Sequence, residues 1–156
     1  MLFRSQSSCM PLRGRSQLSD NRVFFVTTSV RGHSPIFADP AKCRDIMGII
    51  SSFGSRHEII ILGYVIMPTH LHLLLASRRG GPTVSGFMRD IKRVSAKEFA
   101  PTQGGLWESR FDDVAIISKT QFLVKLNYIH NNPVRAGLAI RAERSEERRV
   151  GKECRL

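Results

Sequence analysis

The chain has 156 residues, of which 42% are hydrophobic and 24% charged, with a formal net charge of +11 and a pI near 10.6. This length predicts one domain with enough apolar residues for a core, and no apolar run approaches the roughly 20 residues of a transmembrane helix. A basic excess of this size favours a polyanionic partner, most often nucleic acid, over a merely soluble basic protein.

The N-terminal residues 1–20 are rich in Ser and Arg and lack an apolar signal region, so they are interpreted as a disordered basic arm or the product of a wrongly assigned start. The three cysteines, Cys9, Cys43 and Cys154, are odd in number and show no CxxC spacing. This argues against a disulfide framework or a zinc knuckle and favours a reducing cytoplasm.

The first half of the chain predicts three strands and a helix. Residues 22–30 (RVFFVTTSV) are β-branched and aromatic, which is typical of a strand. Asp39 and Pro40 suit the N-cap and first residue of a helix that is predicted to run to about residue 53 and to end at Gly54. Residues 58–67 and 71–76 predict two buried strands, joined as an antiparallel pair at a turn that contains Pro68.

The second half predicts a helix over residues 84–99, a short strand over 114–117 and a third helix over 119–131. The helix over 84–99 is amphipathic, with apolar residues inward and a basic stripe outward that comprises Arg89, Lys92, Arg93 and Lys97. The order strand, helix, strand, strand, helix, strand, helix predicts an α+β fold. The expected arrangement is a ferredoxin-like antiparallel sheet with the helices packed on one face.

The last residues, 144–156, resemble the in-frame translation of a sequencing adapter, although a solvated charged tail would have the same composition. They contain five basic and three acidic residues, so residues 1–143 keep a net charge of +9. The domain is therefore predicted to span residues 21–143, with a natural C-terminal element replaced by the foreign tail.

His70 and His72 lie two apart within an apolar run. In a strand, this spacing directs both imidazoles to one face, while Leu71 and Leu73 point to the core. Two imidazoles can hold a divalent ion at about 2.0–2.2 Å each. They need a third ligand, and hard Mg²⁺ or Mn²⁺ would also take phosphate and water oxygens. Taken alone, such a pair is more often a chance surface pair than a metal site.

Tyr128 and Asn132 are four residues apart, so they share a face of the third predicted helix, which is expected to end near Asn132 because Pro133 follows. Tyr128 is a candidate nucleophile and the Asn132 side-chain oxygen a candidate third metal ligand. A metal that polarises a scissile phosphate would help a phenol attack it and form a covalent intermediate that can be rejoined to another strand. The structural alternative is a packed tyrosine and a helix-ending asparagine.

Three segments resemble the single-tyrosine HUH endonucleases, the family of IS200-like and REP-associated tyrosine transposases. They are residues 64–75 (YVIMPTHLHLLL), 106–111 (LWESRF) and 128–138 (YIHNNPVRAGL). The resemblance implies that the protein cleaves single-stranded or hairpin DNA with Mg²⁺ or Mn²⁺ through a 5′-phosphotyrosine at Tyr128, in a bacterial nucleoid-associated setting. The chain departs from the family's pattern at Asn132, where many relatives have Gln, and at Thr69, where Asn is frequent.

DNA contacts are predicted for the basic stripe, which could follow a phosphate backbone. Trp107 is predicted to stack on a base and Arg110 to pair with a phosphate, and Arg135 completes the predicted DNA-binding set. The alternatives are a solvated basic face and a core tryptophan. At the level of function, a non-catalytic or truncation-inactivated DNA-binding relative and a hydrolase that uses water remain open, as does the choice between monomer and homodimer.

Overall fold

The structure, a computed structural model, describes residues 22–77, 83–100 and 105–137. The predicted arm over 1–20 and the suspected adapter tail over 144–156 lie outside these residues. Within the described part of the chain, no helix is long and apolar enough to cross a membrane.

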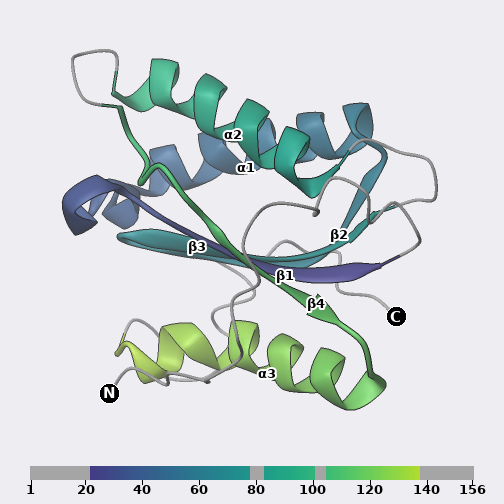
Figure 1. Ribbon diagram of the computed structural model, residues 1–156. Helices are drawn as coiled ribbons and strands as arrows, with labels where there is room; N and C mark the ends of the chain where they lie inside the picture. Colours follow the sequence, from purple (N-terminus) through teal and green to yellow (C-terminus); the bar gives the residue numbers. More distant parts are fainter. Residues whose placement is uncertain (1–21, 78–82, 101–104, 138–156) are drawn as a thin grey trace.

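One four-stranded sheet forms the centre of the molecule (Figure 1). Its strands lie in the order β2-β3-β1-β4, and every neighbouring pair is antiparallel. The strands are β1 (Val23–Ser29), β2 (Ile59–Met67), β3 (His70–Ser77) and β4 (Asp112–Ile116). The helices are α1 (Pro40–Arg56), α2 (Val84–Phe99) and α3 (Lys119–Arg135). The α+β, ferredoxin-like sheet predicted from the order of elements is confirmed.

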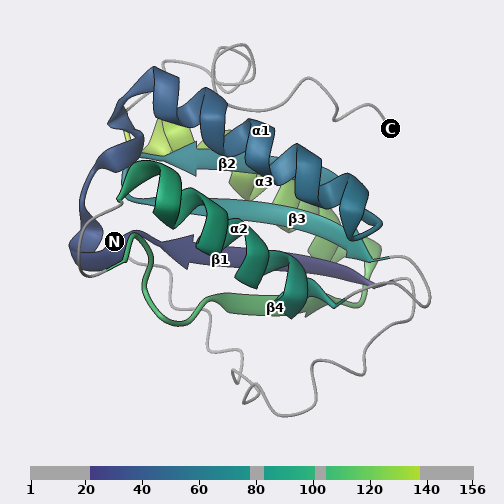
Figure 2. The ribbon, with the colours of Figure 1, turned by 90° about the horizontal axis from the view of Figure 1, so that it is seen from above.

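The position of α3 corrects the expectation that all helices pack on one face. Helices α1 and α2 run side by side across one face of the sheet (Figure 2), whereas α3 covers the other (Figure 1). The reason is that adjacent strand residues point to opposite faces, and here both sets are apolar. Phe24 on β1 is buried toward α1 and α2, whereas its neighbour Phe25 is buried toward α3. A sheet that is apolar on both faces needs cover on both.

The start of α1 follows the prediction, and its end does not. The Asp39 carboxylate caps the helix by accepting a hydrogen bond from the Ala41 amide at 2.8 Å. The helix continues through Gly54 to Arg56. A Cβ at Gly54 would lie 3.3 Å from the Ile59 carbonyl oxygen, so glycine allows a close approach to β2 and does not end the helix.

Helix α3 also runs further than the Asn-Pro sequence predicts. It extends to Arg135 and contains Pro133 in its last turn. Proline removes one backbone donor, but the helical pattern resumes directly after it, because the Ala136 amide donates to the Asn132 carbonyl at 3.0 Å. Tyr128 therefore lies within the helix, two turns before its end.

Candidate functional site

The two histidines lie on the sheet face that α3 covers. On β3, His72 is the direct partner of Thr27 on β1 and of Val65 on β2, and Val65 belongs to the apolar cluster under α3. The ring centroids of His70 and His72 are 4.8 Å apart, with an angle of 79° between the ring planes. His72 is buried, with 5% of its surface exposed, and His70 is half-buried. The predicted orientation of both imidazoles to one face is confirmed.

Helix α3 brings Tyr128 to this pair. The half-buried phenol ring lies with its centroid 5.2 Å from that of His72, in an edge-to-face arrangement. It also meets the Phe25 ring edge-on at 5.8 Å, and Phe25 in turn stacks on His72 at 5.4 Å. The predicted nucleophile and the predicted metal ligands, from distant parts of the sequence, are therefore neighbours in one cluster.

Each imidazole is held at one nitrogen by a threonine hydroxyl. The Thr27 Oγ1 lies 2.9 Å from His72 Nδ1, and the Thr69 Oγ1 lies 3.0 Å from His70 Nδ1. The other nitrogen of His72, Nε2, is buried and has no hydrogen-bond partner among the described residues. A buried polar atom without a partner is costly, about 1–3 kcal/mol, so its presence here points to a ligand.

The surroundings keep both imidazoles neutral near pH 7. Burial lowers the pKa of His72 to about 3, and its neighbours His70 and Lys125 lower it further. Burial also lowers the pKa of His70, with a smaller contribution from His33. Neutral imidazole is the form that binds a metal ion.

The spacing of the two histidine rings is compatible with a shared metal ion. An imidazole nitrogen about 2.1 Å from a metal puts its ring centroid about 3.2 Å from the metal, so two imidazoles whose bonds to the metal meet at roughly a right angle would have centroids about 4.5 Å apart. The observed 4.8 Å is compatible with this. No group of three or more His, Cys, Asp or Glu side chains that could hold a metal occurs in residues 22–77, 83–100 and 105–137.

Asn132, the predicted third ligand, lies one turn after Tyr128 on α3 and is half-buried. Its amide nitrogen is buried without a hydrogen-bond partner among the described residues. Its role as a ligand stays a prediction.

Solved structures with a similar fold are known. No protein-family model and no curated protein matches the chain. It is similar to the structure of a REP-associated tyrosine transposase bound to a REP hairpin, with a TM-score of 0.71 and 21% identity over 80% of this chain and 74% of that one. It is also similar to a Deinococcus radiodurans R1 protein with a provisional assignment as a transposase. That match has a TM-score of 0.53 and 17% identity over 70% of this chain and 88% of that one.

At these identities the likeness shows the fold. The chain has the α+β fold of a REP-associated tyrosine transposase, which agrees with the resemblance drawn from its motifs.

The structure adds residues to the site that the sequence patterns did not indicate. Lys125 precedes Tyr128 by three positions on α3, and its Nζ lies 4.5 Å from the centroid of the Phe25 ring. Burial lowers the pKa of this lysine. The spacing of three along a helix was a usable signal. No comparable signal in the sequence indicated His33, which interacts with His70 from a turn where its own φ is 52°.

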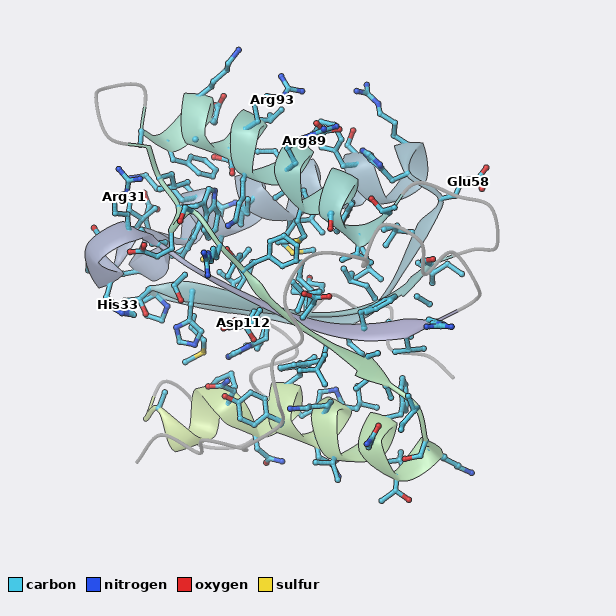
Figure 3. The ribbon with its side chains drawn as sticks, viewed as in Figure 1. Arg31, His33, Glu58, Arg89, Arg93 and Asp112 are labelled. Carbon is cyan, nitrogen blue, oxygen red and sulfur yellow. The ribbon has the colours of Figure 1, made fainter. Side chains whose placement is uncertain are left out.

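The basic stripe lies away from this cluster. Arg89, Arg93 and Lys97 are exposed on α2, and Figure 3 shows Arg89 and Arg93 on the side of the sheet opposite α3. Lys92 does not belong to the exposed stripe. It is half-buried, donates hydrogen bonds to the carbonyls of Glu108 at 2.8 Å and Arg110 at 2.9 Å, and burial lowers its pKa to about 8.

The prediction that Trp107 stacks on a DNA base is wrong, because Trp107 is a core residue. Its ring is 5% exposed and stacks on Phe37 at 5.6 Å, and its Nε1 donates to the buried Ser95 hydroxyl at 2.8 Å. Arg110 is exposed, as a phosphate contact requires. The side chain of Arg135 lies outside the described residues.

Proposed function

We propose that the protein is a transposase-like, metal-dependent endonuclease that nicks and rejoins single-stranded or hairpin DNA through a 5′-phosphotyrosine. The observation that carries the proposal is the position of Tyr128, whose ring lies 5.2 Å from that of His72, itself 4.8 Å from His70. A lone phenol beside two neutral, partly buried imidazoles is suited to attack on a phosphodiester held by a metal ion.

His70 and His72 would hold Mg²⁺ or Mn²⁺, with Asn132 as the proposed third protein ligand. The bound ion would polarise the scissile phosphate and stabilise the negative charge that develops on it. The Tyr128 oxygen forms the new bond to phosphorus while the bond from phosphorus to the 3′ oxygen breaks. The phenol loses a proton and the departing 3′ oxygen gains one, so a free 3′-hydroxyl remains. Attack by a 3′-hydroxyl on the phosphotyrosine reverses the step and joins strands.

The neighbours of Tyr128 support transfer between strands over simple hydrolysis. The phenol lies half-buried against Phe25 and His72, which limits the access of water to the covalent intermediate. The Lys125 ammonium, held over the Phe25 ring, supplies a positive charge on the same face for the DNA phosphate. DNA as the substrate is also supported by the REP hairpin bound to the neighbour in fold.

The test is formation of a covalent protein–DNA adduct on a denaturing gel. Hairpin oligonucleotides with randomised single-stranded flanks and a label at the 3′ end are incubated with Mn²⁺. The label should move with the protein, because the 3′ portion of the strand carries the 5′-phosphate. Chelator should abolish the adduct, and so should Tyr128→Phe. Tyr64→Phe is the matched control, since Tyr64 packs on the opposite face of the sheet, and it should leave the adduct intact.

One observation favours a second candidate, a DNA-binding protein without catalysis. Three basic side chains of α2, Arg89, Arg93 and Lys97, are exposed, and Figure 3 shows Arg89 and Arg93 on the side of the sheet opposite the site. Such side chains can bind phosphates independently of Tyr128. This candidate predicts salt-sensitive binding that Tyr128→Phe leaves unchanged and no adduct with any metal. Adduct formation that persists in Tyr128→Phe would contradict the assignment of the nucleophile.

A further inference from the structure

We infer that Thr27 and Thr69 are positioning residues, whose hydroxyls set the tautomer and orientation of His72 and His70 so that each imidazole presents its Nε2 lone pair to the metal ion. The inference rests on the proposed function, since it assigns residues that prepare the same site. The evidence is a pair of hydrogen bonds between threonine Oγ1 and histidine Nδ1. The distance is 2.9 Å between Thr27 and His72 and 3.0 Å between Thr69 and His70.

Thr27 reaches His72 because of strand register. The two residues are direct partners across β1 and β3, and side chains at such positions have Cβ atoms about 4.5–5.5 Å apart. Threonine is β-branched, so few rotamers are open to it and the hydroxyl is held in place. The stacked ring of Phe25 meanwhile restricts the plane of the His72 imidazole. His72 is thus fixed at one nitrogen and across one ring face.

Thr69 is held by its backbone. It lies in the turn between β2 and β3, where its carbonyl accepts a hydrogen bond from the Val30 amide at 2.8 Å. The preceding carbonyl, of Pro68, accepts one from the Phe37 amide at 3.0 Å. Two bonds to a turn of two residues restrict its motion, so the Thr69 hydroxyl meets the His70 ring from a fixed point. The same contact is thus made twice, from different elements.

The tautomer follows from the chemistry of neutral imidazole, in which one nitrogen donates and the other accepts. If Nδ1 carries the proton, it donates to the threonine oxygen and Nε2 keeps its lone pair for a metal. If Nε2 carried the proton in His72, a buried N–H donor would have no partner among the described residues. In either tautomer the His72 Nε2 lacks a partner among the described residues, but a bound metal ion can satisfy only its lone pair and not an N–H. The inferred arrangement is therefore the one in which Nδ1 donates to the threonine oxygen and Nε2 binds the metal.

If these hydrogen bonds only stabilised the fold, a folded variant without them would keep its metal affinity. Threonine variants distinguish this structural role from the positioning role. Thr27→Val and Thr69→Val remove each hydroxyl and keep the β-branched shape, whereas Thr27→Ser and Thr69→Ser keep the hydroxyl. Thr28→Val is the matched control. Thr28 neighbours Thr27 on β1 and points to the other face, and its buried hydroxyl has no hydrogen-bond partner among the described residues.

Two measurements on the whole, DNA-free chain test the inference. Calorimetric titration with Mn²⁺ alone should show affinity lowered about 10- to 100-fold in each valine variant. The serine variants should restore most of this loss, and Thr28→Val should match the wild type. Nitrogen-15 NMR of the imidazoles without metal should show protonated Nδ1 in the wild type. In Thr27→Val, His72 should show a mixture of tautomers. Thermal unfolding confirms that each variant is folded.

Wild-type affinity for Mn²⁺ in folded Thr27→Val and Thr69→Val would overturn the inference. So would a wild-type protein with protonated Nε2 in His72, or one that binds no Mn²⁺. Failure of the proposed function is distinguishable, because these readouts do not involve Tyr128. If the chain binds Mn²⁺ with the expected dependence on threonine but forms no DNA adduct, the positioning role of the threonines is supported. The proposed endonuclease activity is then contradicted.

Discussion

The two faces of the sheet are built differently. Among the described residues, the face under α1 and α2 contributes to a cluster of nineteen buried residues, whereas the cluster under α3 contains five. The smaller cluster adjoins both imidazoles, the phenol and the Lys125 ammonium. The larger one holds its indole by a hydrogen bond to Ser95. We therefore expect the larger cluster to contribute most of the stability of the domain, whereas the face covered by α3 alone carries the polar groups of the site.

The largest difference in stability between the two faces is expected when one aromatic side chain on each face is truncated. Phe87→Ala on α2 removes a fully buried ring and should lower the free energy of unfolding by about 3–5 kcal/mol. Phe122→Ala on α3 removes a half-buried ring and should cost clearly less. Chemical denaturation measures both. Equal losses would show that the two faces stabilise the domain alike.

Acidification should act on the α3 face. The pKa of His72 is about 3 when folded and 6.5 ordinarily, so between these values the unfolded chain binds a proton that the folded chain does not. Stability should therefore be full above about pH 6.5 and fall as the pH drops, by about 2 kcal/mol between pH 7 and pH 5. The lowered pKa of His70 acts in the same direction.

Denaturation series at several pH values, with chelator present, measure this slope. His72→Gln should flatten it. His33→Asn, at an exposed position with a φ of 52° that asparagine tolerates, should keep most of it. A slope unchanged in His72→Gln would contradict the account of the buried imidazole.

Removing the indole hydrogen bond should cause a smaller loss of stability, on the face covered by α1 and α2. Trp107→Phe deletes the bond from Nε1 to the Ser95 hydroxyl and should destabilise the fold by roughly 1–2 kcal/mol. DNA affinity should not change, because the ring is buried in the core. A base stacked on an aromatic ring is worth about 1–3 kcal/mol, so a loss of that size in a binding assay would restore a DNA-contacting role.

The smallest effect on stability is expected at the surface of α2. Replacing Arg89, Arg93 and Lys97 together by Gln should change the free energy of unfolding by less than about 1 kcal/mol, because all three side chains are exposed. If they bind phosphates, DNA affinity measured against salt concentration should show a shallower slope. An unchanged slope would mean that DNA contacts lie on the α3 face alone.

Local patterns predicted the strands and helices and the shared orientation of the two histidines. Alternation along β3 was enough to direct His70 and His72 to one face, and the helical spacing from Tyr128 to Asn132 was visible in the sequence. The capping of α1 by Asp39 was equally local and is confirmed. Such features depend on a few neighbouring residues, which a sequence shows directly.

What the sequence did not reveal depends on contacts between distant segments. The side of the sheet that α3 covers follows from Phe24 and Phe25 both being buried, and burial is a property of the folded chain. Lysine and tryptophan are typical of DNA-binding surfaces. Lys92 and Trp107, however, are hydrogen-bonded to other segments of the chain, and they are half-buried and buried respectively. The partner of His72 was likewise set by strand register, which brings Thr27 opposite it.

If the chemistry takes place on the α3 face through Tyr128, this residue carries the covalent bond to DNA, and mapping the adduct is the direct test. After reaction with DNA and Mn²⁺, the protein is digested with nuclease and protease and its peptides are examined by mass spectrometry. We expect a nucleotide phosphate on the peptide that contains Tyr128, and none when chelator is present. A nucleotide on another residue, or no modified peptide while DNA is still cleaved, would contradict it.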